Sequence, residues 1–210
     1  MTPWTFFLTH RAEIFSATLD HVGLVIIAMV IAISIGVPLG MAIVQRPTLR
    51  TLSLGVASVF QTIPSLALFG FLIPIPFIGG IGRRTAIVAL VLYALLPILR
   101  NTYVGLTSID PAVLEAAEAM GMTNTQILTR VRLPLAMSII LAGIRTATVI
   151  TIGIATIAAA IGAGGLGTFI FRGVAMVSDA VILAGAIPAA LLAILADLSL
   201  ALLERRLRVI

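Results

Sequence analysis

Residues 110–134 read DPAVLEAAEAMGMTNTQILTRVRLP, a polar stretch set between long apolar runs. Asp110 followed by Pro111 predicts the start of a helix, because an aspartate side chain caps free backbone amides and proline fits the first turn. Gly121 can adopt the left-handed conformation that commonly ends a helix. We therefore predict a short helix over residues 113–120, terminated at this glycine.

A second helix is predicted directly after the first. Thr123 and Gln126 have the spacing of a capping box, in which each side chain bonds the backbone amide of the other residue. Leu133 and Pro134 are expected to end this helix, with Pro134 in the first turn of the next apolar run. The loop of residues 108–134 is thus predicted to hold two short helices joined at Gly121.

This loop is suited to contact with another protein. Ala116, Ala117 and Ala119 are small enough for a partner's groove to approach, and Glu115 and Glu118 add charge at helical i, i+3 spacing. An amphipathic loop resting on the membrane is the alternative. A DNA-binding helix-turn-helix is disfavoured, because the stretch holds three acids against two arginines and is tied at both ends to apolar runs.

The composition indicates an integral membrane protein. Of the 210 residues, 60% are apolar and 10% are charged, and several apolar runs reach the roughly 20 residues that a helix needs to cross a bilayer. Backbone amides in hydrocarbon must bond within their own segment, so the spans are expected to be helical. We predict one all-α membrane domain over residues 1–210, with five spans at 22–44, 52–75, 85–106, 135–161 and 180–203.

The arginines predict an orientation in the lipid bilayer. All 13 basic residues are arginine, and most lie at span ends, which encodes topology rather than nucleic-acid binding despite a net charge of +5. With the N-terminus outside and the C-terminus inside, eight arginines fall inside and four outside. The inside set is Arg46, Arg50, Arg100, Arg130, Arg132, Arg205, Arg206 and Arg208; the outside set is Arg11, Arg83, Arg84 and Arg172.

Several residue types are missing or scarce. The chain has no cysteine and no lysine, and a P-loop needs a lysine to reach nucleotide phosphates, so any ATP used must be bound by another chain. His10 and His21 lie near the N-terminus and are expected at the membrane interface. No nucleophile, paired-histidine or acidic motif is present, so we expect neither catalytic residues nor a metal site.

Glycines interrupt the chain after the fourth span. Gly162, Gly164, Gly165 and Gly167 make the stretch too glycine-rich to continue a helix, and the apolar residues that follow are too few to cross a bilayer. We predict a re-entrant or interfacial segment over residues 162–173.

Polar side chains inside spans are candidates for a pore lining, because they are costly in lipid and tend to face the protein interior. For the serines and threonines, hydrogen bonding between helices is the alternative. Arg145 is expected to pair with a carbonyl group or an acid, and Asp197 is the other charge within a span. The candidates are Gln61, Thr62, Ser65, Tyr93, Asn101, Arg145, Thr148 and Thr151, together with Pro64, which interrupts the second span.

The triplet Glu115-Ala116-Ala117, with Gly121 four residues later and Leu133-Pro134 about a dozen beyond, resembles the EAA loop of the membrane subunits of bacterial binding-protein-dependent ABC importers. The resemblance implies a five-transmembrane-helix permease core like that of methionine permeases (MetI-like), with a cytoplasmic coupling helix held in a groove of an ATPase. The coupling residues that it implies are Leu114, Glu115, Ala116, Ala117, Glu118, Gly121, Leu133 and Pro134.

Further segments resemble the osmoprotectant (quaternary-amine) branch of that family. They are QTIPSLAL at 61–68, YALLPILRNT at 93–102, MGMT at 120–123, GIRTA at 143–147 and IGAGGLG at 161–167. This resemblance implies ATP-driven import of glycine betaine, choline or carnitine through the bacterial cytoplasmic membrane. It also implies four kinds of partner: two P-loop ATPase subunits that bind Mg-ATP, a second permease subunit, identical or paralogous, an extracytoplasmic binding protein, and the bilayer. The glycine segment would then be the outer gate.

Two other functions stay open at this point. An importer of an amino acid such as methionine would have the same five-helix plan. A passive channel or a secondary transporter would need no ATPase, although a secondary transporter often has inverted repeats with broken helices in both halves, and no such repeat is apparent.

Overall fold

The computed structural model describes residues 3–207, so Arg208 of the topology count lies outside the described residues. Four long helices dominate: α2 (Arg11–Ala42), α5 (Arg83–Thr107), α8 (Leu133–Ile157) and α10 (Asp179–Arg206). Residues 3–207 contain no strand, as the all-α prediction requires. The shorter elements are α1 (Pro3–Thr9), η1 (Ile43–Gln45), α3 (Pro47–Thr62), α4 (Ser65–Leu72), α6 (Pro111–Ala119), α7 (Asn124–Gln126), η2 (Ile127–Arg132), η3 (Ala158–Ile161) and α9 (Gly167–Ala175).

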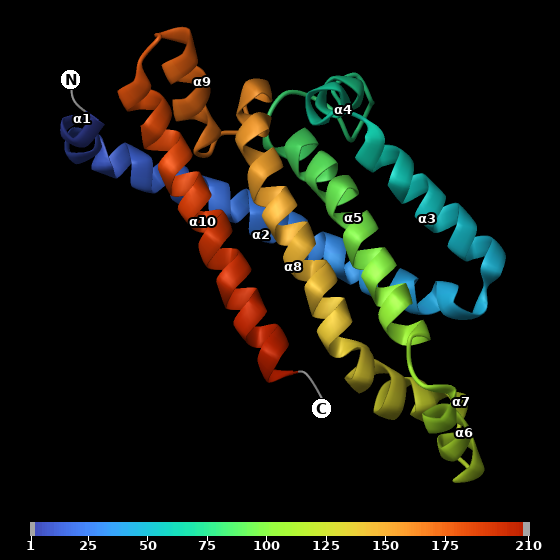
Figure 1. Cartoon of the computed structure of the whole chain (residues 1–210). Helices are drawn as coiled ribbons and strands as arrows, with labels where there is room; N and C mark the ends of the chain where they lie inside the picture. The colour runs from blue at the N-terminus through green and yellow to red at the C-terminus, as the bar shows by residue number, and fades with distance from the viewer. Residues whose placement is uncertain (1–2, 208–210) are drawn as a thin grey trace.

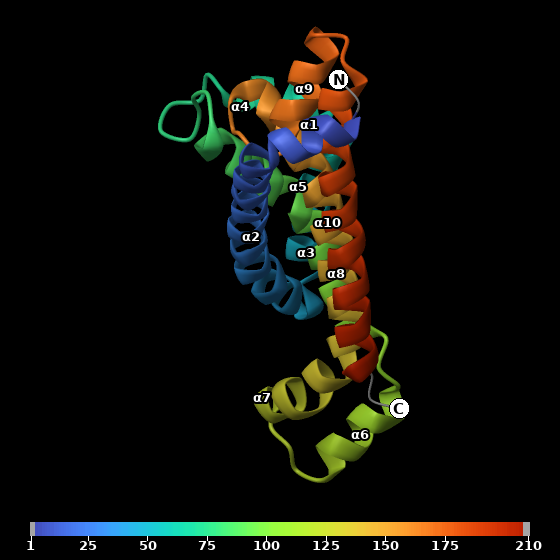
Figure 2. The same ribbon diagram turned by 90° about the vertical axis from the view of Figure 1, so that its left-hand side faces the viewer.

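The helices form two layers. In Figure 1, α3, α5, α8 and α10 follow one another across the molecule, and α2 crosses behind α5 and α8. The main apolar core lies between these layers and includes Leu24 and Met29 of α2, Leu90 and Ile98 of α5, and Ile152 of α8. Figure 2 shows that α6 and α7 project beyond one end of the layers, while α9 and α1 lie at the other end. The polar loop and the glycine segment therefore occupy opposite ends of the molecule.

The second predicted span, residues 52–75, differs most from the predicted helices. Among residues 3–207, four helices are long and apolar enough to cross a membrane, and the count becomes five if α3 and α4 together make one span. These two helices bend by 105°, so residues 52–75 do not form one straight helix. Pro64 lies at the bend and explains it, because proline has no amide hydrogen and its ring clashes with the carbonyl four residues earlier.

The polar loop also ends differently from the prediction. Leu133 and Pro134 do not end a helix, since residues Asn124–Ile161 form one continuous helical run. The turn just before Pro134 is instead a π-helix, η2, in which bonds reach one residue farther than in an α-helix. This wider turn accommodates the proline without a break, so the second helix of the polar loop and the fourth span form one continuous helical rod over residues Asn124–Ile161.

Candidate functional site

The first helix of the polar loop begins and ends as its sequence predicts. The Asp110 carboxylate accepts a hydrogen bond from the amide of Ala112 at 2.9 Å, and Pro111 is in the first turn. Gly121 has φ of 77° and its amide donates to Glu118 O at 2.9 Å. The amide of Met122 donates to Ala117 O at 3.2 Å, which completes a Schellman motif.

The capping box is confirmed as well. The Thr123 amide donates to Gln126 Oε1 at 2.8 Å, and the Gln126 amide donates to Thr123 Oγ1 at 3.4 Å. These two bonds fix the start of the rod that continues into α8. The direction of α6 relative to this rod is therefore set by the residues around Gly121 and by the packing of α6 on η2.

The exposed face of α6 is narrower than the sequence suggested. Ala117 is only 2% exposed and lies where α6 packs on η2. Leu114 is half-buried, whereas Glu115, Ala116 and Glu118 are exposed. A partner protein would therefore meet the two carboxylates and Ala116 together with the exposed side chains of Val113 and Met120, whereas Ala117 would hold α6 against the rod.

The candidates Gln61, Thr62, Pro64 and Ser65 come together at the bend between α3 and α4. A bend in a membrane helix frees backbone carbonyls, which must find other donors. Thr62 Oγ1 donates to Val59 O at 2.8 Å. The hydroxyl of Tyr93, whose side chain is buried, donates to Ile63 O. Tyr93 thus supports the bend from α5.

We expect Tyr93→Phe to lower stability by about 1–3 kcal/mol, because it leaves the Ile63 carbonyl without its donor in apolar surroundings. Thermal unfolding of the detergent-purified protein measures this. Tyr103→Phe is the matched control: Tyr103 is half-buried and bonds Arg50 at 2.7 Å, so its effect should be smaller. An equal loss of stability in the two variants would contradict the proposed support of the α3–α4 bend by Tyr93.

The glycine segment turns the chain at the end of the fourth span. Gly162, Gly164 and Gly165 have φ of 75°, 84° and 79°, a region that residues with side chains rarely adopt. Gly167 has no such φ but begins α9 in tight contact with α8. A Cβ built on Gly167 would lie 1.8 Å from Thr156 O, which leaves no space for any side chain.

His21 also belongs to this region and lies inside the protein. The side chain is fully buried, and Nε2 lies 3.2 Å from Ile152 O. A Cβ on Gly165 would lie 3.0 Å from His21 Nδ1, so the histidine packs directly against the glycine segment. The signal missed in the sequence is helical spacing, since His21 continues the buried stripe of Leu24, Val25 and Ala28 along α2.

Arg145 does not join the other pore candidates. It lies between α8 and α10, where Nε and Nη2 donate to the two carboxylate oxygens of Asp197 at 2.5 and 2.8 Å. Its Nη1 lies 3.6 Å from Glu204 Oε2. The pairing of Arg145 with an acid, expected from the sequence, is thereby confirmed, and the acid is Asp197.

Three further candidates bond within their own helices. Asn101 Nδ2 donates to Pro97 O at 2.8 Å, and the hydroxyls of Thr148 and Thr151 donate to carbonyls four residues earlier at 2.8 and 2.7 Å. Within residues 3–207, no group of three His, Asp or Glu side chains is placed to hold a metal ion.

An all-helical, multi-pass membrane domain, with a folded polar loop at one end and a glycine-turned segment at the other, has the architecture of a transporter's membrane subunit. The chain belongs to the family described as binding-protein-dependent transport system inner membrane component, whose model matches residues 32–209. This membership identifies a non-catalytic membrane subunit and excludes the channel and secondary-transporter alternatives.

Relatives and a solved structure agree with this family. The chain is 48% identical to a glycine betaine/carnitine/choline transport system permease protein, OpuCD, of Bacillus subtilis, over 89% of this chain and 81% of that protein. It is 43% identical to a carnitine transport permease protein, OpuCB, of Listeria monocytogenes, over 97% of this chain and 92% of that protein. The fold matches an inward-facing conformation of the MetNI methionine ABC transporter with a TM-score of 0.82 at 25% identity, over 92% of this chain and 95% of that one.

Proposed function

We propose that this chain is the membrane-spanning subunit of an ATP-driven importer of quaternary-amine osmoprotectants such as glycine betaine, choline and carnitine. The observation that carries the proposal is the identity of 43–48%, over nearly the whole chain, to permeases named for these compounds. The methionine transporter shares the fold at only 25% identity. Methionine import is therefore the less favoured alternative.

The proposed complex places two cytoplasmic ATPases beneath two permease subunits, which are identical or paralogous. This chain has no lysine for a P-loop, so Mg-ATP would be bound and hydrolysed on the ATPases. An extracytoplasmic binding protein would deliver the substrate to the opposite end. The arginine distribution supports an orientation with the N-terminus outside and α6 in the cytoplasm.

In this complex, α6 would be the coupling helix. Its exposed Glu115 and Glu118 would contact the ATPase, and its packing on η2 would pass the movement to the rod of residues Asn124–Ile161. Movement of rigid elements between two packed arrangements is a common basis of alternating access. The glycine segment lies at the far end of the same rod, where an outer gate is needed.

Substrate selection is assigned to the binding protein rather than to this subunit. A quaternary ammonium is best held by a cage of several aromatic rings. In the part of the chain that the structure describes, Tyr93 bonds the Ile63 carbonyl and Tyr103 contacts Arg50. Trp4 is 78% exposed on α1, at the opposite end of the molecule from α6 (Figure 2). These three rings therefore lie in different parts of the described structure and do not form one aromatic cage.

The coupling role is tested by Glu115→Arg. We expect uptake of labelled glycine betaine, by cells that express the whole system, to fall by roughly ten-fold or more, because reversing a charge in a protein interface costs several kcal/mol. Gly121→Leu should act similarly, because leucine disfavours the left-handed conformation. Both variant proteins should accumulate in the membrane in normal amounts, because most side chains of α6 are exposed and contribute little to folding.

Glu115→Asp is the matched control, since it keeps the negative charge at the same exposed position and should leave uptake near that of wild type. Uptake by the Glu115→Arg and Gly121→Leu variants equal to wild type would remove α6 from the coupling role. If cells accumulate labelled methionine instead of glycine betaine, the proposed substrate class is wrong, but the same variants still test the coupling role of α6.

A further inference from the structure

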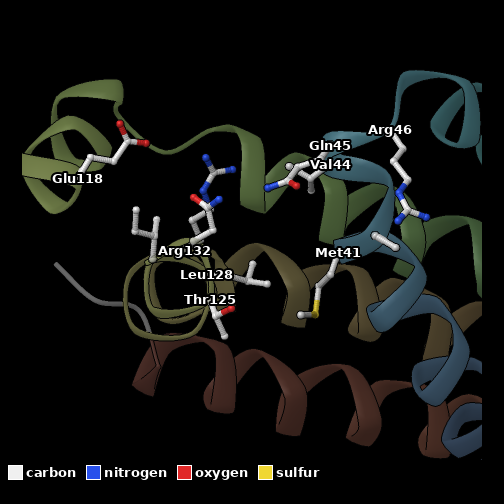
Figure 3. Close-up of a pocket in the computed structure, with 11 residues that line it drawn as sticks. Met41, Val44, Gln45, Arg46, Glu118, Thr125, Leu128 and Arg132 are labelled. Carbon is white, nitrogen blue, oxygen red and sulfur yellow. The ribbon is translucent and has the colours of Figure 1, made fainter. Parts of the chain in front are cut away.

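A cavity of about 340 Å³ lies between the end of the first span and the polar loop (Figure 3). One wall comes from the end of α2 and η1, and the other from α6, α7 and η2. The cavity is thus at the level where two long helices leave their apolar runs. Its polar lining consists of Gln45, Arg46, Glu118, Asn124, Thr125 and Arg132.

The charges of this lining suit a monoanion. Arg46 and Arg132 contribute two positive charges and Glu118 one negative charge, which leaves one unbalanced positive charge. Among residues 3–207, neither arginine side chain makes an ion pair or a hydrogen bond. In Figure 3, Arg132 extends from η2 toward Gln45, and Glu118 is on the α6 side, whereas the guanidinium group of Arg46 lies apart from that of Arg132, beyond Val44 and Gln45. A guanidinium group offers paired donors that match two phosphate oxygens.

Charge also separates two kinds of phosphate. A phosphate monoester carries a charge of about −1.5 to −2 at neutral pH, which the lining would not balance while Glu118 is ionised. A phosphodiester carries a single negative charge and has two free oxygens for the paired donors of the Arg132 guanidinium group. The amides of Gln45 and Asn124 and the hydroxyl of Thr125 can supply further donors.

The remaining wall of the cavity is apolar. Met41, Val44, Ile127 and Leu128 line it. Met41, Val44 and Leu128 pack on a buried cluster around Leu106 beneath them. A small inorganic anion gains nothing from such a wall, whereas the glycerol and first acyl carbons of a lipid do. Basic pockets between membrane helices on the cytoplasmic side are known to bind lipid headgroups.

We propose that this cavity binds the phosphodiester headgroup of a membrane phospholipid, held by Arg132 and Gln45, with Arg46 adding positive charge at the other end of the cavity and with the glycerol region of the lipid against Met41, Val44 and Leu128. The lipid would connect the end of the first span to α7 and η2, so its presence would bias the position of the polar loop. The binding itself is independent of the proposed function, and only an effect on uptake rests on it.

The test is native mass spectrometry of the full chain, delipidated in detergent and titrated with phosphatidylglycerol or with diacylglycerol of the same acyl chains. We expect the phosphatidylglycerol adduct to exceed the diacylglycerol adduct by roughly ten-fold, because charged hydrogen bonds to the phosphate are lost in diacylglycerol. The double variant Arg46→Gln, Arg132→Gln should lose this preference. Arg130→Gln is the matched control, since Arg130 is two residues from Arg132 but does not line the cavity.

Equal retention of the two lipids by the wild type, or an unchanged preference in the double variant, overturns the proposal. Displacement of phosphatidylglycerol by millimolar inorganic phosphate would assign the cavity to a free anion and overturn the lipid assignment. If the double variant does not fold, Arg132→Lys replaces it, because lysine keeps the charge but not the paired donors, and the preference should fall part of the way. If the protein binds the lipid but neither the wild type nor any variant takes up glycine betaine, the proposed function is contradicted and the lipid site still stands.

Discussion

Gly167→Ala is expected to leave much less folded protein in the membrane and to abolish uptake. The Cβ of alanine would lie 1.8 Å from Thr156 O and 2.7 Å from the carbonyl carbon of Thr156. Both neighbours are backbone atoms, so no side chain can rotate away and either α9 or the end of α8 must shift. Such overpacking costs about 2–3 kcal/mol, and the shift displaces the glycine segment proposed as the outer gate.

Gly153→Ala is the matched control for this change. Gly153 lies in α8, close to the Thr156 carbonyl that Gly167 contacts, and a Cβ built on Gly153 meets nothing within 4 Å. Alanine there should raise helix stability by about 0.5–1 kcal/mol. Thermal unfolding of the detergent-purified chain compares the two variants directly, and labelled uptake then tests the gate. A Gly167 variant as stable as the Gly153 variant would contradict the close packing of α9 on α8.

The polar loop could be predicted nearly residue by residue, because its structure depends on local chemistry. Asp110, Pro111, Gly121 and the capping box at Thr123 act on amides within a few residues of themselves. The failure at Pro134 has a physical reason. Proline excludes the ordinary bonding pattern, and it can be accommodated either by a helix end or by a wider turn. The sequence does not distinguish these two outcomes.

The candidate pore and gate residues were harder to place, because their roles depend on contacts between distant segments. Polarity within a span marks Gln61, Tyr93 and Arg145 equally, yet two of them lie at or against the α3–α4 bend and the third joins α8 to α10. Tyr93 reaches Ile63 across 30 positions of sequence. Spacing along one helix does not predict such pairs. The burial of His21, by contrast, follows from spacing within one helix, since it extends the buried stripe of Leu24, Val25 and Ala28 along α2.

Arg145→Met is expected to reduce the amount of folded protein in the membrane more than any other change in the group of Arg145, Asp197 and Glu204. Removing Arg145 leaves Asp197, within the last span, without its cation, and charges in spans are tolerated mainly when paired. Asp197→Leu should be milder, because Arg145 then retains Glu204, whose Oε2 lies 3.6 Å from Nη1. Glu204→Gln should be the mildest, since both bonds between Arg145 and Asp197 remain.

The order of these three effects separates a pairing role from a simple loss of packing. Immunoblots of membrane fractions give the accumulated amount, and melting in detergent gives the stability of what is inserted. The exchange Arg145→Asp with Asp197→Arg should recover part of the protein that either single change loses, because the opposite charges again face each other between α8 and α10. If Arg145→Met accumulates like Glu204→Gln, or the exchange recovers nothing, the ion pair does not hold these two helices together. In that case the apolar contacts between α8 and α10 would suffice to position the last span.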